Sequence, residues 1–299
     1  MKSFSQLTKE ELCKTDNSRK CCYRAEHLGL LLFGATITRK TIKFVTENTD
    51  VHLNYINLAE KNGLNQEIDK STEKNSRIIS QNNDRVLIEN FLYDLRLIDS
   101  ETGVIRYRID EEIIKNECCR RSLIKGAFLA GGTVIDPQKN YNLELVTPYM
   151  GLSQDMQREL TKAGFDFKII NRKSKYVLYM KNSDNIADFL SYMGAYRAQM
   201  ELLNIKIEKE IRNDFNRAAN SETANLFKTI NASVEQVHAI EKVKKNIGLD
   251  NLPEDLREIA VLRLENKEMS LAELGKMVNP PLTKSGVNHR LKKLIEMAK

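Results

Sequence analysis

The chain has 299 residues, of which 41% are hydrophobic, and it carries a formal net charge of +6. This length and composition predict two or three domains with packed cores. No run of about 18 apolar residues is present, which argues against a transmembrane helix, and the amino-terminal residues lack the apolar segment of a signal peptide. We therefore expect a cytoplasmic protein that does not enter a membrane.

A short segment of the sequence occurs twice, after an amino-terminal helix that we expect in residues 1–20. Residues 21–36 read CCYRAEHLGLLLFGAT and residues 118–133 read CCRRSLIKGAFLAGGT. Each copy places a glycine inside a helical pattern, Gly29 and Gly126, at a cost of about 1 kcal/mol. Small residues let two helix backbones approach closely, so we expect these helices to pack together across a pseudo-two-fold axis. The alternative is that each helix is buried against its own sheet.

The similarity continues beyond these helices and predicts two structural repeats, in residues 21–117 and 118–203. Each repeat is expected to contain a helix, a strand, a helix, further strands and a closing helix. The second copy predicts a hairpin over 165–181, whereas its counterpart over 77–84 is predicted as one short strand. The other predicted elements are the strands TIKFVT (41–46) and NLELVT (142–147), the helices 50–63 and 151–164, which end at glycine, and the closing helices 84–97 and 182–195.

Five cysteines include two adjacent pairs, Cys21–Cys22 and Cys118–Cys119. An odd number in a cytoplasmic chain argues against a framework of disulfides. Zinc sites usually use Cys-x2-Cys spacing, which does not occur here, and the four histidines are scattered. The sequence therefore predicts no metal site and no cofactor, and we expect the cysteines to be small residues at helix starts near a core.

A polar segment follows the repeats, and we assign residues 204–236 to a helical linker. Residues 210–236 are rich in Asn, Ser and Thr and contain neither glycine nor proline, which predicts a polar helix-loop-helix. Its side chains could bind phosphate or form a hydrogen-bonded joint between domains, and the sequence favours the joint. The residues concerned are Arg212, Asn213, Arg217, Asn220, Glu222, Asn225 and Lys228.

The last segment, residues 237–299, predicts three further helices. The first begins at Pro253, and Ser270 with Glu273 forms a capping-box pattern that opens a short second helix. A break at VNPPL precedes a third helix over 283–298. One face of this third helix is apolar, with Val287, Leu291, Leu294, Ile295 and Ala298.

The opposite face of the third helix is basic, since residues 284–299 contain five basic groups and one acidic group. A short helix, a turn and a longer basic helix predict a helix-turn-helix, whose second helix enters the major groove of DNA. The alternative is a solvated basic helix in a bundle. We expect Ser285, Asn288 and His289 to reach base edges. The predicted interface also includes Ser270 and the phosphate-contacting residues Lys284, Arg290, Lys292 and Lys293.

Two segments of the repeats resemble a known enzyme family. LIKGAFLAGG (123–132) is similar to the LAGLIDADG helix of homing endonucleases, and HLGLLLFGA (27–35) is similar to its diverged partner. The resemblance implies an α+β domain of two units related by a pseudo-two-fold axis, in which each helix ends in an acid that holds the metal for DNA cleavage. Gly34 and Gly131 stand at those positions.

A glycine supplies no side-chain oxygen for a magnesium ion, which requires oxygen ligands and would stabilise the charge of the transferred phosphoryl group. The nearest acids, Glu47 and Asp136, do not form a matched pair. The resemblance therefore implies a retained scaffold without nuclease activity, and the sequence predicts that the protein is not an enzyme.

The carboxyl-terminal helices resemble the fourth region of bacterial sigma factors, and the chain as a whole resembles the WhiA family. That family resemblance implies a DNA-binding transcription regulator with roles in cell division, chromosome segregation and, in sporulating relatives, sporulation. The expected partner is double-stranded DNA at promoter sites in the nucleoid, with RNA polymerase or another regulator protein as a further candidate. The resemblance is carried by RSLIKGAFLAGGTVIDP (121–137), RN-x2-NR-x2-NSETANLFKT (212–229), LDNLPEDLREIAVLRLENKEMSLAELG (249–275) and PPLTKSGVNHRL (280–291).

Two other functions stay open from the sequence, an active endonuclease and a protein-interaction scaffold for which DNA binding is secondary. Residues 41–117 contain 10 basic and 15 acidic groups. Acidic groups facing phosphates would cost several kcal/mol. We therefore expect the repeats alone to bind DNA weakly or not at all, and to support a protein partner or orient the helix-turn-helix.

Overall fold

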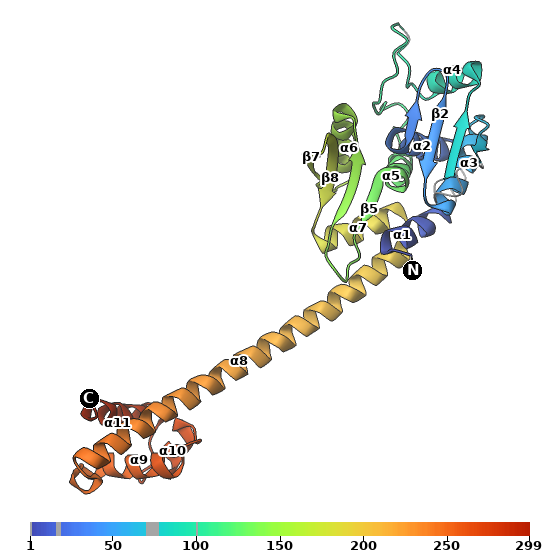
Figure 1. Cartoon of the computed structure of the whole chain (residues 1–299). Coiled ribbons are helices and arrows are strands. Elements are labelled where there is room, and N and C mark those ends of the chain that lie inside the picture. The colour runs from blue at the N-terminus through green and yellow to red at the C-terminus, as the bar shows by residue number, and fades with distance from the viewer. Residues whose placement is uncertain (1, 16–18, 70–77, 100) are drawn as a thin grey trace. The chain divides into compact units, whose positions relative to one another are not determined.

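The computed structural model describes the chain except for residues 1, 16–18, 70–77 and 100. The chain divides into two compact units, Met1–Lys209 and Glu210–Lys299 (Figure 1). One helix, α8 (Tyr196–Asn246), contributes residues to both units. Within the described residues, no helix has the length and apolar character that crossing a bilayer requires.

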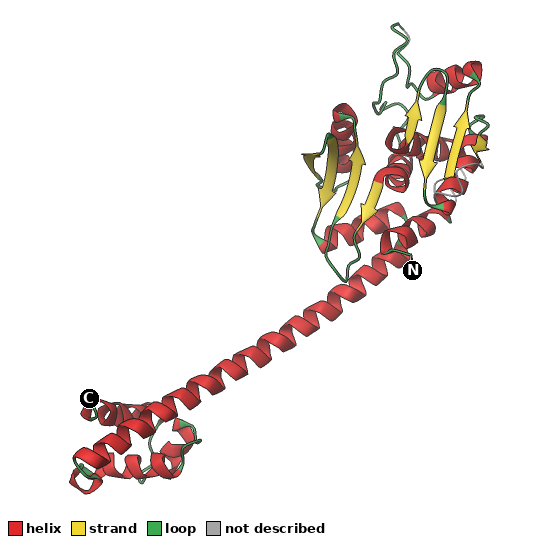
Figure 2. Cartoon of the chain, in the orientation of Figure 1, coloured by secondary structure: helices red, strands yellow, loops and turns green. Residues whose placement is uncertain are grey.

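The first unit begins with α1 (Phe4–Cys13), which lies within the residues 1–20 where the sequence predicts an amino-terminal helix. Two series of elements in the same order follow it, and Figure 2 distinguishes the helices of the chain from its strands. The first series is α2 (Lys20–Gly34), β1 (Ala35–Ile37), β2 (Ile42–Thr46), α3 (Thr49–Lys61), β3 (Glu67–Asp69), β4 (Ile78–Asn82) and α4 (Arg85–Asp94). The second series is α5 (Glu117–Gly131), β5 (Gly132–Val134), β6 (Leu143–Thr147), α6 (Met150–Lys162), β7 (Lys168–Arg172), β8 (Lys175–Met180) and α7 (Ser183–Met193).

The two series form two four-stranded antiparallel sheets with equivalent topology. The strand orders are β1-β2-β4-β3 and β5-β6-β8-β7, so each strand of one sheet has a counterpart in the other. Central pairs include Phe44 opposite Ser80 and Leu145 opposite Leu178. This arrangement confirms an α+β domain built from two repeats.

Three short strands differ from the sequence expectation. The strands β1 and β5 directly follow α2 and α5 and were not predicted, because three residues are too few to show an alternating pattern. Within 77–84 the predicted strand is β4, and residue 77 lies outside the described residues. The strand itself is therefore present. However, the prediction that the hairpin of the first copy is reduced to this one strand was wrong, because β3 pairs antiparallel with β4.

The predicted helix stops are confirmed at the ends of α3 and α6. Gly63 and Gly164 follow these helices with φ of +76° and +89°, a left-handed backbone conformation that glycine adopts without a Cβ clash. At the first of them, the Leu64 N–H donates to the Ala59 carbonyl at 2.8 Å. This bond closes the helix end in the manner of a Schellman motif.

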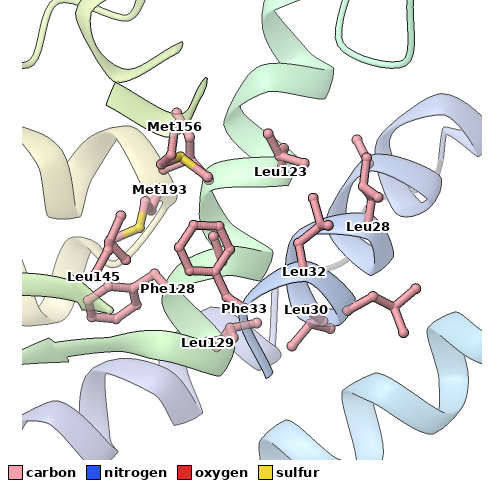
Figure 3. Close-up of a cluster of buried hydrophobic side chains, with 14 of the residues drawn as sticks. Leu28, Leu30, Leu32, Phe33, Leu123, Phe128, Leu129, Leu145, Met156 and Met193 are labelled. Atoms are coloured by element: carbon pink, nitrogen blue, oxygen red, sulfur yellow. The ribbon is translucent and has the colours of Figure 1, made fainter. Parts of the chain in front are cut away.

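The helices α2 and α5 pack against each other between the two sheets. A Cβ added to Gly29 would lie 2.7 Å from the Ala127 nitrogen, and one added to Gly126 would lie 2.9 Å from the Glu26 carbonyl carbon. Both distances are too short for real contacts, so the two backbones approach as closely as glycine permits. The predicted helix pair is confirmed, and Figure 3 shows the apolar side chains of this region, including Leu28, Leu32, Phe33, Leu123 and Phe128.

A buried ion pair lies in the same helix pair. Lys125 Nζ is 3.1 Å from Glu26 Oε1, and the two side chains are 5% and 2% exposed. Asn54 Nδ2 donates to the same carboxylate oxygen at 2.9 Å, and Lys125 Nζ donates to the Thr15 carbonyl at 3.0 Å. These hydrogen bonds offset part of the desolvation cost of burying two charges.

The second unit contains the end of α8, the short 3-10 helix η2 (Leu249–Asn251), and the helices α9 (Glu254–Glu265), α10 (Leu271–Met277) and α11 (Lys284–Met297). The predicted loop within residues 210–236 is wrong, because α8 continues through the whole segment. Asn, Ser and Thr lower helix propensity by only fractions of a kcal/mol each, whereas glycine and proline, which break helices, are absent. The seven polar residues named for this segment are all exposed on the helix.

Candidate nucleic-acid interface

The helices α9, α10 and α11 pack around one apolar core with the end of α8. On α11 the residues Val287, Leu291 and Leu294 are buried, which confirms the predicted apolar face. The short helix, the turn and the longer helix form the predicted helix-turn-helix arrangement. The other core residues include Ile240, Val243, Leu256, Ile259, Leu274 and Ala298.

Side-chain caps determine where α10 and α11 begin. The Ser270 hydroxyl accepts from the Glu273 N–H at 3.3 Å, while the Glu273 carboxylate accepts from the Ser270 N–H at 2.8 Å. This is the predicted capping box. Thr283 Oγ1 accepts from the Gly286 N–H at 3.2 Å and starts α11 after the prolines. The Ser270 hydroxyl, which was predicted to contact DNA, is thus engaged in capping α10.

The turn between α10 and α11 passes very close to the α10 backbone. The Leu282 N–H donates to the Gly275 carbonyl at 2.8 Å. A Cβ added to Gly275 would lie 3.2 Å from the Leu282 carbonyl carbon and closer still to its oxygen. Glycine at this position therefore allows the long, proline-containing turn to fold back and place α11 across α10.

The side of α11 opposite the core carries most of the residues predicted to bind DNA. Among the parts of the chain that the structure describes, no ion pair engages Lys284, Lys292 or Lys293. Their charges are therefore available to an anionic partner such as the DNA backbone. The exposed residues are Lys284, Ser285, His289, Lys292 and Lys293, and Asn288 is half-buried.

Arg290 has a different environment from the lysines. Its Nε is 3.7 Å from Asp255 Oδ2, and its Nη1 donates to the Asp255 carbonyl at 3.4 Å. Asp255 lies in the first turn of α9. The structure thus places the Arg290 guanidinium against α9, where it holds two helices of the unit together rather than standing free beside the lysines.

Arg263 is a residue of the unit whose role the sequence did not reveal. It is 2% exposed, and its Nη1 donates to the carbonyls of Met269 at 2.7 Å and Asn266 at 3.3 Å. These carbonyls belong to the loop that joins α9 to α10, so the guanidinium positions the start of the helix-turn-helix. The available signal was an arginine at helical spacing from the apolar residues Leu256 and Ile259.

Replacing Arg263 with methionine is expected to destabilise the second unit by about 1–3 kcal/mol, because several loop carbonyls lose their buried donor. The midpoint of urea denaturation, followed by circular dichroism, measures the effect. The matched control is Arg257→Met on the exposed side of the same helix, which should stay within about 0.5 kcal/mol of the unchanged protein. Equal stability of the two variants would show that the loop does not depend on Arg263.

The positions aligned with catalytic acids lie at the carboxyl ends of the central helices. The helices α2 and α5 end at Gly34 and Gly131, so neither position offers an oxygen ligand from a side chain. A surface hollow beside Gly131 includes Glu47 in its lining. The Asp136 carboxylate instead accepts a hydrogen bond from the Gln138 N–H of its own loop, at 2.9 Å.

Comparison with known proteins agrees with both halves of this description. Residues 120–212 match the WhiA LAGLIDADG-like domain, and residues 215–298 match the WhiA C-terminal HTH domain. The crystal structure of full-length DUF199/WhiA from Thermotoga maritima aligns with a TM-score of 0.59 and 28% identity, and it covers 99% of this chain and 98% of that one. The N-terminal LAGLIDADG domain of DUF199/WhiA aligns with a TM-score of 0.51 over 65% of this chain and 94% of that one, at 20% identity, and supports the fold alone.

The fold and the site thus define a protein with a LAGLIDADG-like domain followed by a helix-turn-helix domain. A relative from Alkaliphilus metalliredigens, named as a probable cell division protein WhiA, is 38% identical over 310 residues, covering 99% of this chain and 97% of the relative. This chain belongs to the WhiA family.

Proposed function

We propose that this protein is a sequence-specific DNA-binding regulator of transcription that acts in cell division. The observation that carries the proposal is the exposed face of α11, where three lysines without ion-pair partners among the described residues flank Asn288 and His289. Lysines that neutralise phosphates supply affinity, and polar side chains at base edges supply specificity. The names of the relatives support the role in cell division.

The expected ligand is double-stranded DNA at promoter sites, bound by the protein in the nucleoid of the cytoplasm. RNA polymerase or a second regulator protein is a further candidate partner, because a regulator must act on the transcription machinery. Roles in chromosome segregation and in sporulation belong to the same proposal and rest on the family resemblance.

Replacing Lys292 with glutamine should weaken binding to all DNA sequences alike and should make the salt dependence less steep by about 0.9 in the slope of log K against log salt concentration. Replacing Asn288 with alanine should instead reduce the preference for a selected duplex over random DNA by about 1–3 kcal/mol. Fluorescence anisotropy at several salt concentrations, with a duplex selected from a randomised pool, measures both quantities.

The control for both substitutions is Lys242→Gln, which removes an exposed lysine of the same unit outside α10 and α11. This variant should bind as the unchanged protein does. If both α11 variants also bind unchanged at physiological salt, α11 is not the element that reads DNA.

The proposal includes the loss of nuclease activity in the first unit. Its support is the pair of glycines at the ends of α2 and α5, where metal-dependent phosphodiester cleavage would need oxygen ligands. The test is incubation of the protein with Mg²⁺ and supercoiled plasmid. Reproducible cleavage that co-purifies with the protein would identify an endonuclease instead.

A further inference from the structure

Four cysteines meet at the amino-terminal ends of the two central helices. Cys21 and Cys22 are the second and third residues of α2, and Cys118 and Cys119 occupy the same positions in α5. The pseudo-two-fold arrangement brings the two pairs together, so that all four Sγ atoms lie within 4.8 Å of one another. None of the four is part of a disulfide.

The spacing of these sulfur atoms is close to that of a tetrahedral metal site. Zinc binds thiolates at about 2.3 Å, which places the four sulfur atoms of a regular tetrahedron about 3.8 Å apart. The Sγ atoms of Cys21 and Cys22 are 3.9 Å apart, and those of Cys118 and Cys119 are 4.0 Å apart. A disulfide needs about 2.05 Å, so the cluster is nearer to the geometry of four ligands around one ion.

Positive groups lie beside the cluster, whereas burial disfavours the thiolate form of Cys22 and Cys119 in the absence of a metal ion. The positive ends of two helix dipoles lie at the cluster and stabilise negative charge. The side chains of the N-cap residues, Arg19 and Asn116, do not cap their helices. In addition, Arg19 Nη1 is 4.0 Å from Cys118 Sγ. Four thiolates and one Zn²⁺ carry a net charge of −2. The helix amino ends and Arg19 reduce the energetic cost of holding this negative charge in a partly buried place.

The cluster has a solvent-facing side and a buried side. Cys21 is exposed and Cys118 is half-buried, whereas Cys22 and Cys119 are 4% and 1% exposed. An ion can therefore enter from solvent and become covered on the opposite side, which is one of the requirements of a usable site.

We propose that Cys21, Cys22, Cys118 and Cys119 form a structural Zn²⁺ site that joins the two repeats. Four protein ligands complete the tetrahedral coordination of zinc and leave no position for a substrate, so the role is structural. The site lies at the amino ends of α2 and α5, whereas Gly34 and Gly131 lie at their carboxyl ends. It is therefore separate from the positions aligned with the acids of the endonucleases.

The test begins with the metal content of the full-length protein, purified with a thiol reductant and supplied with Zn²⁺ before desalting. Native mass spectrometry should find one zinc ion per chain. Co²⁺ bound in place of zinc should show the intense thiolate-to-cobalt charge-transfer absorption of a sulfur-rich tetrahedral site. A strong chelator should remove the ion and lower the midpoint of thermal unfolding, since a ligand bound only to the folded state stabilises it.

The diagnostic variant is Cys21→Ser combined with Cys118→Ser, which changes the two more accessible ligands. It should lose the zinc and the cobalt absorption, and its unfolding midpoint should no longer respond to chelator. The matched control is Cys13→Ser, the fifth cysteine, which lies outside the cluster and should keep one zinc ion.

Three results would overturn the proposal. One is an unchanged protein that retains no zinc and gives no thiolate–cobalt absorption. Another is a double variant that binds as much zinc as Cys13→Ser does. The third is peptide mapping that finds Cys22–Cys118 or Cys21–Cys119 disulfides in the freshly purified, reduced protein. If the double variant fails to fold, the metal content and cobalt spectrum of the unchanged protein still decide the question.

Discussion

Replacing Gly126 with leucine is expected to unfold the first unit of the protein. The new Cβ would meet the backbone of Glu26, whose carbonyl carbon would lie 2.9 Å away. A side chain can relieve such a contact by changing rotamer, but a helix backbone can relieve it only if α2 and α5 move apart. Overpacking of a core costs about 1–3 kcal/mol even where side chains can adjust.

Separating α2 and α5 would also expose the apolar residues that they bury together, so we expect a loss of more than about 3 kcal/mol, a large part of the 5–15 kcal/mol that stabilises a typical domain. Thermal unfolding followed by circular dichroism measures it. The control is Gly286→Ala in α11, where the added Cβ would lie 3.6 Å from Leu282 side-chain atoms, an ordinary contact. That change should be neutral or stabilising. A folded Gly126→Leu variant with an unchanged midpoint would contradict the close backbone contact.

Replacing Lys125 with methionine is expected to destabilise the first unit by about 3–5 kcal/mol, because it removes the ammonium group that lies 3.1 Å from the buried Glu26 carboxylate. The two side chains are 5% and 2% exposed, so water cannot replace the ammonium group without opening the helix pair. Hydrogen bonds to the carboxylate, such as the one from Asn54, would remain, but the neutral amide of Asn54 does not replace the charge of Lys125. Urea denaturation at neutral pH gives the free energy of unfolding.

The double variant Glu26→Gln with Lys125→Met separates the loss of the ion pair from the effect of removing Lys125 beside a carboxylate that stays buried. It removes both charges and should recover most of the stability, since apolar or neutral replacements of a whole buried pair are often close to neutral. The sign of the coupling energy in this double-mutant cycle distinguishes these two contributions to the loss of stability. If the single variant loses less than about 1 kcal/mol, the ion pair is not a buried structural contact.

Much of the fold was accessible from the sequence because its signals are local. The two similar segments indicated the repeats, alternation predicted β2 and β6, and glycines predicted the ends of α3 and α6. The capping box of Ser270 and the apolar stripe of α11 depend on residues three or four positions apart, so they could be read directly. The prediction of a loop within residues 210–236 was wrong, because the same polar residues that favour loops are tolerated in a long exposed helix such as α8.

The sequence therefore determined which residues of α11 point away from its apolar face, but not which of them contact other helices of the unit. Arg290 reaches Asp255 and Arg263 reaches the carbonyls of a loop, and both contacts depend on how α9 packs in three dimensions. The cysteines are the clearest case. Adjacent residues of one helix cannot surround an ion, and Cys22 and Cys118 are 96 positions apart in the chain. Only the pairing of α2 with α5 through Gly29 and Gly126 brings the two cysteine pairs together. A rule about ligand spacing applies to residues close in the sequence, whereas the pseudo-two-fold axis brings together residues that are far apart in the sequence.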